Sequence, residues 1–168
     1  MHSNVRSKMI HSHLDRSKWA IPKESEFSPC LDGEYAWKNI GGCVINEAFS
    51  IFCENPSYYS GDYIHMGEIG FAYYFPVIDK FAREGALGEP FDEQDMSTVL
   101  LILDCNTRIS KLHKKITVEV INLIQYLQEI VPHVATCNKE KRRFTNKLQL
   151  IANAIPKQSS ANRIGEGF

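Results

Sequence analysis

One stretch of the chain, residues 63–85, constrains the fold more than any other part of the sequence. It reads YIHMGEIGFAYYFPVIDKFAREG. Its apolar side chains fall into two adjacent rows at helical spacing, the first with Phe71, Phe75 and Ile78 and the second with Tyr74, Val77 and Phe81. An apolar surface this broad is typical of a helix in the centre of a domain. Pro76 lies inside the stretch and would cost a straight helix ~3 kcal/mol or more, so we expect either a kink or two short helices meeting at Phe75 and Pro76.

The remaining apolar residues also recur at helical spacing. They predict five further helices at residues 4–17, 43–54, 96–112, 117–131 and 138–155. Asn55-Pro56 and Pro132 are expected to end two of them, and PSYYSGD after Asn55 is expected to be a loop. The sequence therefore predicts an all-α fold, a single-domain helical bundle of five to six helices over residues 1–155 with a proline-kinked central aromatic helix. Residues 156–168 are polar without periodicity and are expected to form a flexible C-terminal tail.

Length, composition and charge exclude several classes of protein. The 168 residues suit one domain, since single domains commonly run to roughly 100–200 residues. Hydrophobic residues make up 43% and charged residues 23%, which is typical of soluble globular proteins and not of disordered chains. No apolar run approaches the ~18 residues that span a bilayer, and no apolar stretch follows the basic N-terminus, so we expect a cytoplasmic protein without a membrane segment. The net charge of −1 argues against a dedicated nucleic-acid binder.

The motifs of common active sites and metal centres do not occur in the sequence. The five cysteines form no C-x-x-C pair and are interpreted as reduced thiols. No H-E-x-x-H, G-x-S-x-G or glycine-rich phosphate loop occurs, and the histidines are interpreted as surface or capping residues. The sequence therefore predicts no catalytic residue, no cofactor and no bound metal. The alternative of a small, metal-dependent helical-bundle enzyme would use Glu47, Glu54, His65 and Glu68.

An acidic stretch lies between the central helix and the next one. Residues 84–95 contain five carboxylates and no lysine or arginine. Such a stretch can steer a basic protein partner, and tyrosines in a nearby loop are favoured interface anchors. The predicted partner-binding residues are Tyr58, Tyr59, Glu89, Asp92, Glu93 and Asp95. The competing interpretations are a solvated acidic loop and tyrosines that pack as lids over the bundle.

A basic run opens the last predicted helix. Lys139, Lys141, Arg142 and Arg143 stand in its first turns, where positive charge opposes the helix dipole. They form a candidate anion-binding site, which in the alternative of a nucleic-acid-associated regulator would contact a phosphate backbone. They can equally form a solvated face, or be neutralised by the acidic residues 84–95.

The central stretch resembles a family of small, uncharacterised bacterial domains. The signature of that family is a helix reading Phe-x-Tyr-Tyr-Leu-Pro, shortly after a helix preceded by a tryptophan. Phe71, Tyr73, Tyr74 and Pro76 match it, while Phe75 replaces the leucine. Trp37 corresponds to the tryptophan, and ITVEVINLIQYLQEI is similar to the closing helix of the family. The resemblance implies a helical architecture and transfers no catalytic residue.

These observations favour a non-enzymatic cytoplasmic protein-binding module. A compact helical domain with separate acidic and basic regions and no catalytic motif is the pattern expected of an immunity or antitoxin-type protein that binds and neutralises a partner, for example a toxin. The enzyme and the nucleic-acid regulator remain the alternatives.

Overall fold

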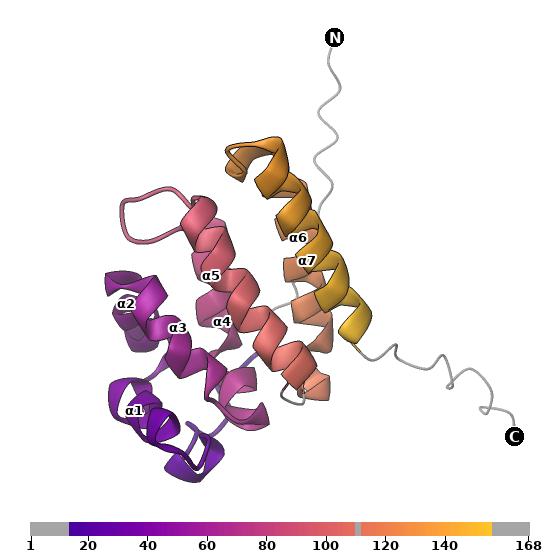
Figure 1. Cartoon of the computed structure of the whole chain (residues 1–168). Coiled ribbons are helices and arrows are strands. Elements are labelled where there is room, and N and C mark those ends of the chain that lie inside the picture. The colour runs from indigo at the N-terminus through magenta and orange to yellow at the C-terminus, as the bar shows by residue number, and fades with distance from the viewer. Residues whose placement is uncertain (1–13, 110–111, 156–168) are drawn as a thin grey trace, which may run out of the picture.

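The computed structural model describes residues 14–109 and 112–155, and these residues are mainly helical (Figure 1). They form α1 (Leu31–Ile40), α2 (Ile45–Glu54), α3 (Pro56–Ile64), α4 (Glu68–Glu84), α5 (Glu93–Asp104), α6 (Thr117–Val134) and α7 (Asn138–Ala154). Short turns add η1 (Glu24–Glu26), η2 (Cys105–Ile109) and η3 (Lys114–Ile116). The described part of the chain has no β-strand beyond one isolated bridge between Phe27 and Met66, so the all-α prediction is confirmed. None of its helices combines the length and the apolar character that a bilayer crossing requires.

The aromatic helix α4 is the most deeply buried element. Eleven of its seventeen residues are buried, and it packs against α2 and α5. In Figure 1 it lies behind α5, with α1–α3 on one side and the pair α6–α7 on the other. The helix runs without interruption through Pro76, so the division into two short helices is wrong. A kink at Pro76 stays a prediction.

The carbonyl that Pro76 leaves without its helical donor has a replacement partner. Proline has no N–H, so it cannot bond the carbonyl four residues earlier, which belongs to Ala72. The Nε of buried Arg16 donates to this oxygen over 3.0 Å. The guanidinium in turn forms an ion pair with Glu119 of α6, with 2.6 Å between Arg16 Nη2 and Glu119 Oε2. This contact satisfies the backbone at the proline and ties α4, α6 and the segment before η1 together.

Helix α3 replaces the loop that the sequence predicted after Asn55. The Asn55 side chain accepts a hydrogen bond of 3.1 Å from the Tyr58 N–H and caps the helix, and Pro56 occupies its first position. Proline is favoured there because the first N–H of a helix has no partner within the helix and the proline φ is already helical. The Asn-Pro pair therefore ends α2 and starts α3 at once.

Other boundaries also differ from the predictions. The described residues contain seven α-helices where five to six were expected, because α1 and α3 were not predicted. Helix α6 continues past Pro132 to Val134, since proline itself has a helical φ, and α5 ends at Asp104 in the π-helical turn η2. Most of the predicted helix 4–17 and the whole predicted tail 156–168 lie outside the described residues, and residues 14–17 are not helical.

The core is aromatic around α4 and aliphatic toward α6 and α7. Phe52 of α2 makes edge-to-face contacts with Tyr63 and Phe81, with ring centroids 5.0 Å apart in both pairs. The Tyr74 hydroxyl donates to the carbonyls of Ile40 and Cys43, each over 2.9 Å. All five cysteines are free thiols, as predicted.

Candidate functional site: a groove between α5 and α7

The surface of the bundle is hollowed between α5 and α7. The groove has a volume of about 470 Å³. Its lining residues are Ser97, Leu100 and Leu101 from α5, and Arg143, Phe144, Asn146, Lys147 and Leu150 from α7. The spacing of three and four residues on each helix puts these side chains on facing stripes. The groove therefore lies between the facing stripes of two neighbouring helices that run in the same direction, since Ser97 meets Arg143 and Asp104 meets Lys147 further along both.

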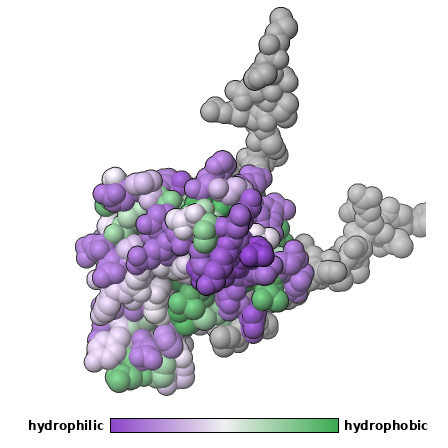
Figure 2. Space-filling view, turned by 45° about the horizontal axis from the view of Figure 1, so that its top comes forward, coloured by the Kyte–Doolittle hydropathy of each residue, from purple (hydrophilic) through white to green (hydrophobic). Residues whose placement is uncertain are grey.

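The floor and walls of the groove are apolar. Leu100 and Phe144 are buried, whereas Leu101 and Leu150 keep 47% and 53% of their surface exposed. Figure 2 shows that hydrophobic patches on the visible face are small and are separated by hydrophilic surface. Both exposed leucines line the groove, so apolar side chains meet water on its α5 wall and on its α7 wall.

The rim of the groove is basic. Arg143 and Lys147 are the only charged side chains among the lining residues. Arg143 Nη2 donates to Ser97 Oγ over 3.0 Å and its Nε pairs with Glu140, so it spans from α7 to α5. Lys147 Nζ lies 2.6 Å from Asp104 Oδ2, and this pair also joins the two helices. Polar contacts thus join the two helices beside the groove, and each of its two cations also has a carboxylate partner within the fold.

The predicted acidic contacts are mostly used inside the molecule. Asp92 is the N-cap of α5, and its carboxylate accepts from the N–H groups of Gln94 and Asp95 over 2.8 and 2.9 Å. The Asp95 carboxylate accepts from the Asp92 N–H over 3.2 Å. Glu93 accepts from the Thr136 N–H and hydroxyl over 2.8 and 2.6 Å, and these bonds, with a smaller effect of Arg143, lower its pKa. Glu89 is exposed in the loop before α5.

The two predicted tyrosine anchors lie on α3 and not in a loop. Tyr58 keeps 67% of its surface exposed, while Tyr59 is half-buried and packs against the core. Their rings meet edge to face with centroids 5.0 Å apart. Tyr58 is therefore accessible to a partner, and Tyr59 mainly supports the packing of α3.

The basic run divides into two parts. Lys139, Lys141 and Arg142 are exposed on the first turns of α7, whereas Arg143 belongs to the groove. Arg143 contributes to the lowered pKa of Glu93, so one carboxylate of the acidic stretch interacts with the basic start of α7. Part of the charge at the start of α7 is thus neutralised within the fold.

The four residues of the metal-dependent alternative do not assemble. The Glu47 carboxylate caps α2 by accepting from the Val44 N–H over 3.1 Å, and Glu54 is exposed at the other end of that helix. Among residues 14–109 and 112–155, one group of three side chains has its ligand atoms within reach of a single ion, and it combines His65 with Cys30 and Asp32. His113 caps η3 through its Nδ1, as expected of a capping histidine.

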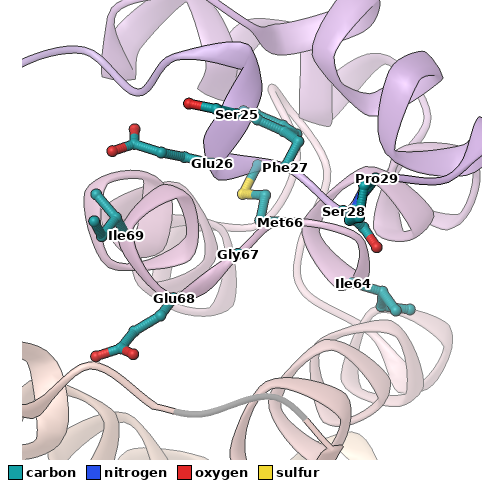
Figure 3. Close-up of a pocket in the computed structure, with 10 residues that line it drawn as sticks. All are labelled: Ser25, Glu26, Phe27, Ser28, Pro29, Ile64, Met66, Gly67, Glu68 and Ile69. Carbon is teal, nitrogen blue, oxygen red and sulfur yellow. The ribbon is translucent and has the colours of Figure 1, made fainter.

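A second pocket of about 470 Å³ surrounds the Phe27–Met66 bridge (Figure 3). In Figure 3 the carboxylates of Glu26 and Glu68 extend away from Phe27 and Met66. Glu26 is engaged in accepting from the Lys23 N–H over 2.9 Å. The pocket therefore brings no pair of acid and base groups to a common point.

The groove residues were not among the predicted site residues, apart from Arg143. In the sequence, the groove leucines can be recognised as apolar residues next to the core-facing stripe of their helix. Leu101 follows the buried Leu100, and Leu150 precedes the buried Ile151.

A comparison of the chain with protein-family models, curated proteins and solved structures finds no match. The resemblance to a bacterial domain family stays a prediction.

Proposed function

We propose that this chain is a non-enzymatic protein-binding module whose groove between α5 and α7 receives an apolar, acidic segment of a partner protein. The observation that carries the proposal is the pair of exposed leucines, Leu101 of α5 and Leu150 of α7, that line one groove whose charged lining residues are both cations. A groove with apolar walls suits the apolar face of an amphipathic helix, and its charge selects for carboxylates at the edge of that face.

The charge of the partner differs from the sequence-based expectation. Asp92, Glu93 and Asp95 form hydrogen bonds within the fold, so their oxygens compete poorly for a basic partner. Arg143 and Lys147 also have internal partners, but both side chains remain partly exposed beside the leucines. A partner carboxylate can share these cations without losing contact with the apolar floor. An immunity or antitoxin-type role, with an acidic segment of a toxin as the occupant, is the specific form of this proposal.

The test measures binding of a fluorescent helical peptide with leucines at positions i, i+3 and i+7 and glutamates along the flanks. We expect Leu101→Asp and Leu150→Asp to abolish its binding, because each puts a carboxylate into an apolar wall of the groove. Lys147→Gln should weaken it and reduce its salt dependence, since exposed charge pairs are screened by salt. The matched control is Leu87→Asp, since Leu87 is 73% exposed outside the groove.

Two results would refute the proposal. The first is binding of the peptide that is unchanged by both leucine substitutions while circular dichroism shows that the variants are folded. The second is equal binding of a peptide with lysines in place of the glutamates, since a basic rim must discriminate between the two.

A further inference from the structure

Three side chains with different metal-binding groups converge where α1 and α3 meet. Cys30 is the N-cap of α1, Asp32 lies in its first turn, and His65 follows the last residue of α3. The thiol, one carboxylate oxygen and one ring nitrogen lie within 4.8 Å of one another. His65 Nε2 is 3.7 Å from Asp32 Oδ2. This cluster is independent of the groove, to which none of its residues contributes.

The backbone holds these residues in fixed relative positions. The Ser28 N–H donates to the His65 carbonyl over 2.8 Å, and the Gly67 N–H donates to the Glu26 carbonyl over 2.7 Å. Two glycines permit this close approach. A Cβ at Gly33 would lie 1.9 Å from the Ser28 carbonyl oxygen, and one at Gly67 would lie 2.6 Å from that of Glu26. The segment that ends in Cys30 is therefore locked against the turn that carries His65.

We propose that Cys30, Asp32 and His65 form a site for a divalent transition metal of the zinc type, with the remaining coordination position open to water. Thiolate, imidazole and carboxylate are the ligands that Zn²⁺ takes in proteins. Tetrahedral ligand atoms lie about 3.3–3.6 Å apart when each is about 2.0–2.3 Å from the metal. The His65–Asp32 separation of 3.7 Å is already close to this spacing. Cys30 and Asp32 are exposed, so rotation of their side chains can close the remaining distance.

The arrangement fits an ion better than a catalytic relay. In a cysteine–histidine–carboxylate relay the two ring nitrogens serve the two partners on opposite sides of the imidazole. Here a single ring nitrogen lies within 4.8 Å of both the thiol and the carboxylate, so the three groups point to a common centre. The nearby carboxylate of Asp62 is buried and accepts from Asn39 Nδ2 over 3.0 Å, which leaves the site with three protein ligands.

The test titrates the reduced full-length chain with Co²⁺, which occupies zinc-type sites and reports thiolate ligation by a charge-transfer band in the near ultraviolet. We expect the band in the wild-type chain, its loss in Cys30→Ser, and its displacement by Zn²⁺. Loss of even an outer-shell partner weakens metal sites about 10–100-fold, so Asp32→Asn and His65→Gln should weaken Co²⁺ binding by at least about tenfold. Serine is a favoured N-cap, and Cys30→Ser should therefore leave α1 intact.

Matched controls exist in the chain. Cys137 is also an exposed cysteine at a helix N-cap, and His133 is an exposed histidine, so Cys137→Ser and His133→Gln should leave the band unchanged. A variant with both His11→Gln and His13→Gln should also keep the band, because the N-terminal histidines are not ligands of the proposed site. No thiolate band in the wild-type chain, or a band that survives Cys30→Ser or is lost equally in Cys137→Ser, would overturn the proposal.

Discussion

Arg16 donates a hydrogen bond to the carbonyl of Ala72, the one oxygen in α4 that Pro76 deprives of its helical donor. The same guanidinium pairs with Glu119 over 2.6 and 3.1 Å and lies 5.3 Å from the centre of the Trp19 ring. A buried arginine is costly unless its donors are satisfied, and here four oxygens, from Leu14, Ala72 and both atoms of the Glu119 carboxylate, and an aromatic ring surround it. The proline in the central helix and the buried ion pair are therefore parts of one arrangement.

This relationship predicts a measurable coupling between Arg16 and Pro76. Arg16→Met should lower the free energy of unfolding by about 3–5 kcal/mol, because it removes one partner of a buried ion pair. In a Pro76→Ala background the new N–H can bond the Ala72 carbonyl, so the same substitution should cost less. Urea unfolding of the four proteins of this cycle should give a coupling of about 1 kcal/mol. Strict additivity of the two substitutions would contradict the assignment.

The acidic residues before α5 are predicted to act on stability. Asp92→Ala removes an N-cap that accepts two backbone hydrogen bonds and should cost about 0.5–2 kcal/mol. Glu89→Ala, in the exposed loop three residues earlier, should change stability by less than about 0.5 kcal/mol. Chemical denaturation distinguishes the two, and equal effects would argue that Asp92 is a solvated residue like Glu89.

Two glycines are predicted to respond in opposite directions to replacement by alanine. Gly33→Ala brings a methyl group against the Ser28 backbone, which cannot move without breaking the contact with His65, so we expect a loss of about 1–3 kcal/mol. Gly61 lies inside α3, and a Cβ there meets nothing within 4 Å. Gly61→Ala should raise stability by about 0.5–1 kcal/mol, since alanine has the higher helix propensity. Thermal unfolding of both variants checks the signs.

Asp62 is predicted to reduce stability as the pH rises. Burial raises its pKa above the ordinary value of 3.8, although the hydrogen bond from Asn39 and the charge of His65 partly oppose this. Between 3.8 and the raised pKa the unfolded chain releases its proton first, so the free energy of unfolding falls as the pH increases through this interval. Asp62→Asn removes this loss of stability and keeps a side-chain oxygen that can accept the hydrogen bond from Asn39. Relative to wild type, the variant should therefore be more stable at pH 7 than at pH 3.

Asp15 provides a control, because its effect on stability should depend on pH with the opposite sign. Hydrogen bonds from Ser17 lower its pKa, so its stabilising effect is present above 3.8 and is lost as the pH falls through the lowered pKa. The free energy of unfolding of Asp15→Asn, relative to that of the wild type, should therefore be lower at pH 7 than at pH 3. If the stability of both variants changed with pH in the same direction, the raised pKa of Asp62 and the lowered pKa of Asp15 would be contradicted.

The periodicity of apolar residues predicted the helices that present a continuous stripe to the core. The helix over 138–155 is found at Asn138–Ala154, and the central aromatic stretch is a single buried helix. Short helices that rely on their ends were missed. The start of α3 is defined by the cap at Asn55 and by Pro56, whereas the apolar pattern indicates only that α2 ends there. The exposed leucines of the groove were missed because a stripe does not reveal which helix lies beside it.

The sequence by itself determined the helical class and the buried face of α4, because both depend on residues a few positions apart along one helix. Only the tertiary structure decided how Arg16 compensates Pro76, how Cys30 meets His65, and which leucines line the groove between α5 and α7. Those contacts join residues that are distant in the chain, and their geometry depends on how the helices pack. Local spacing carries no information about that packing.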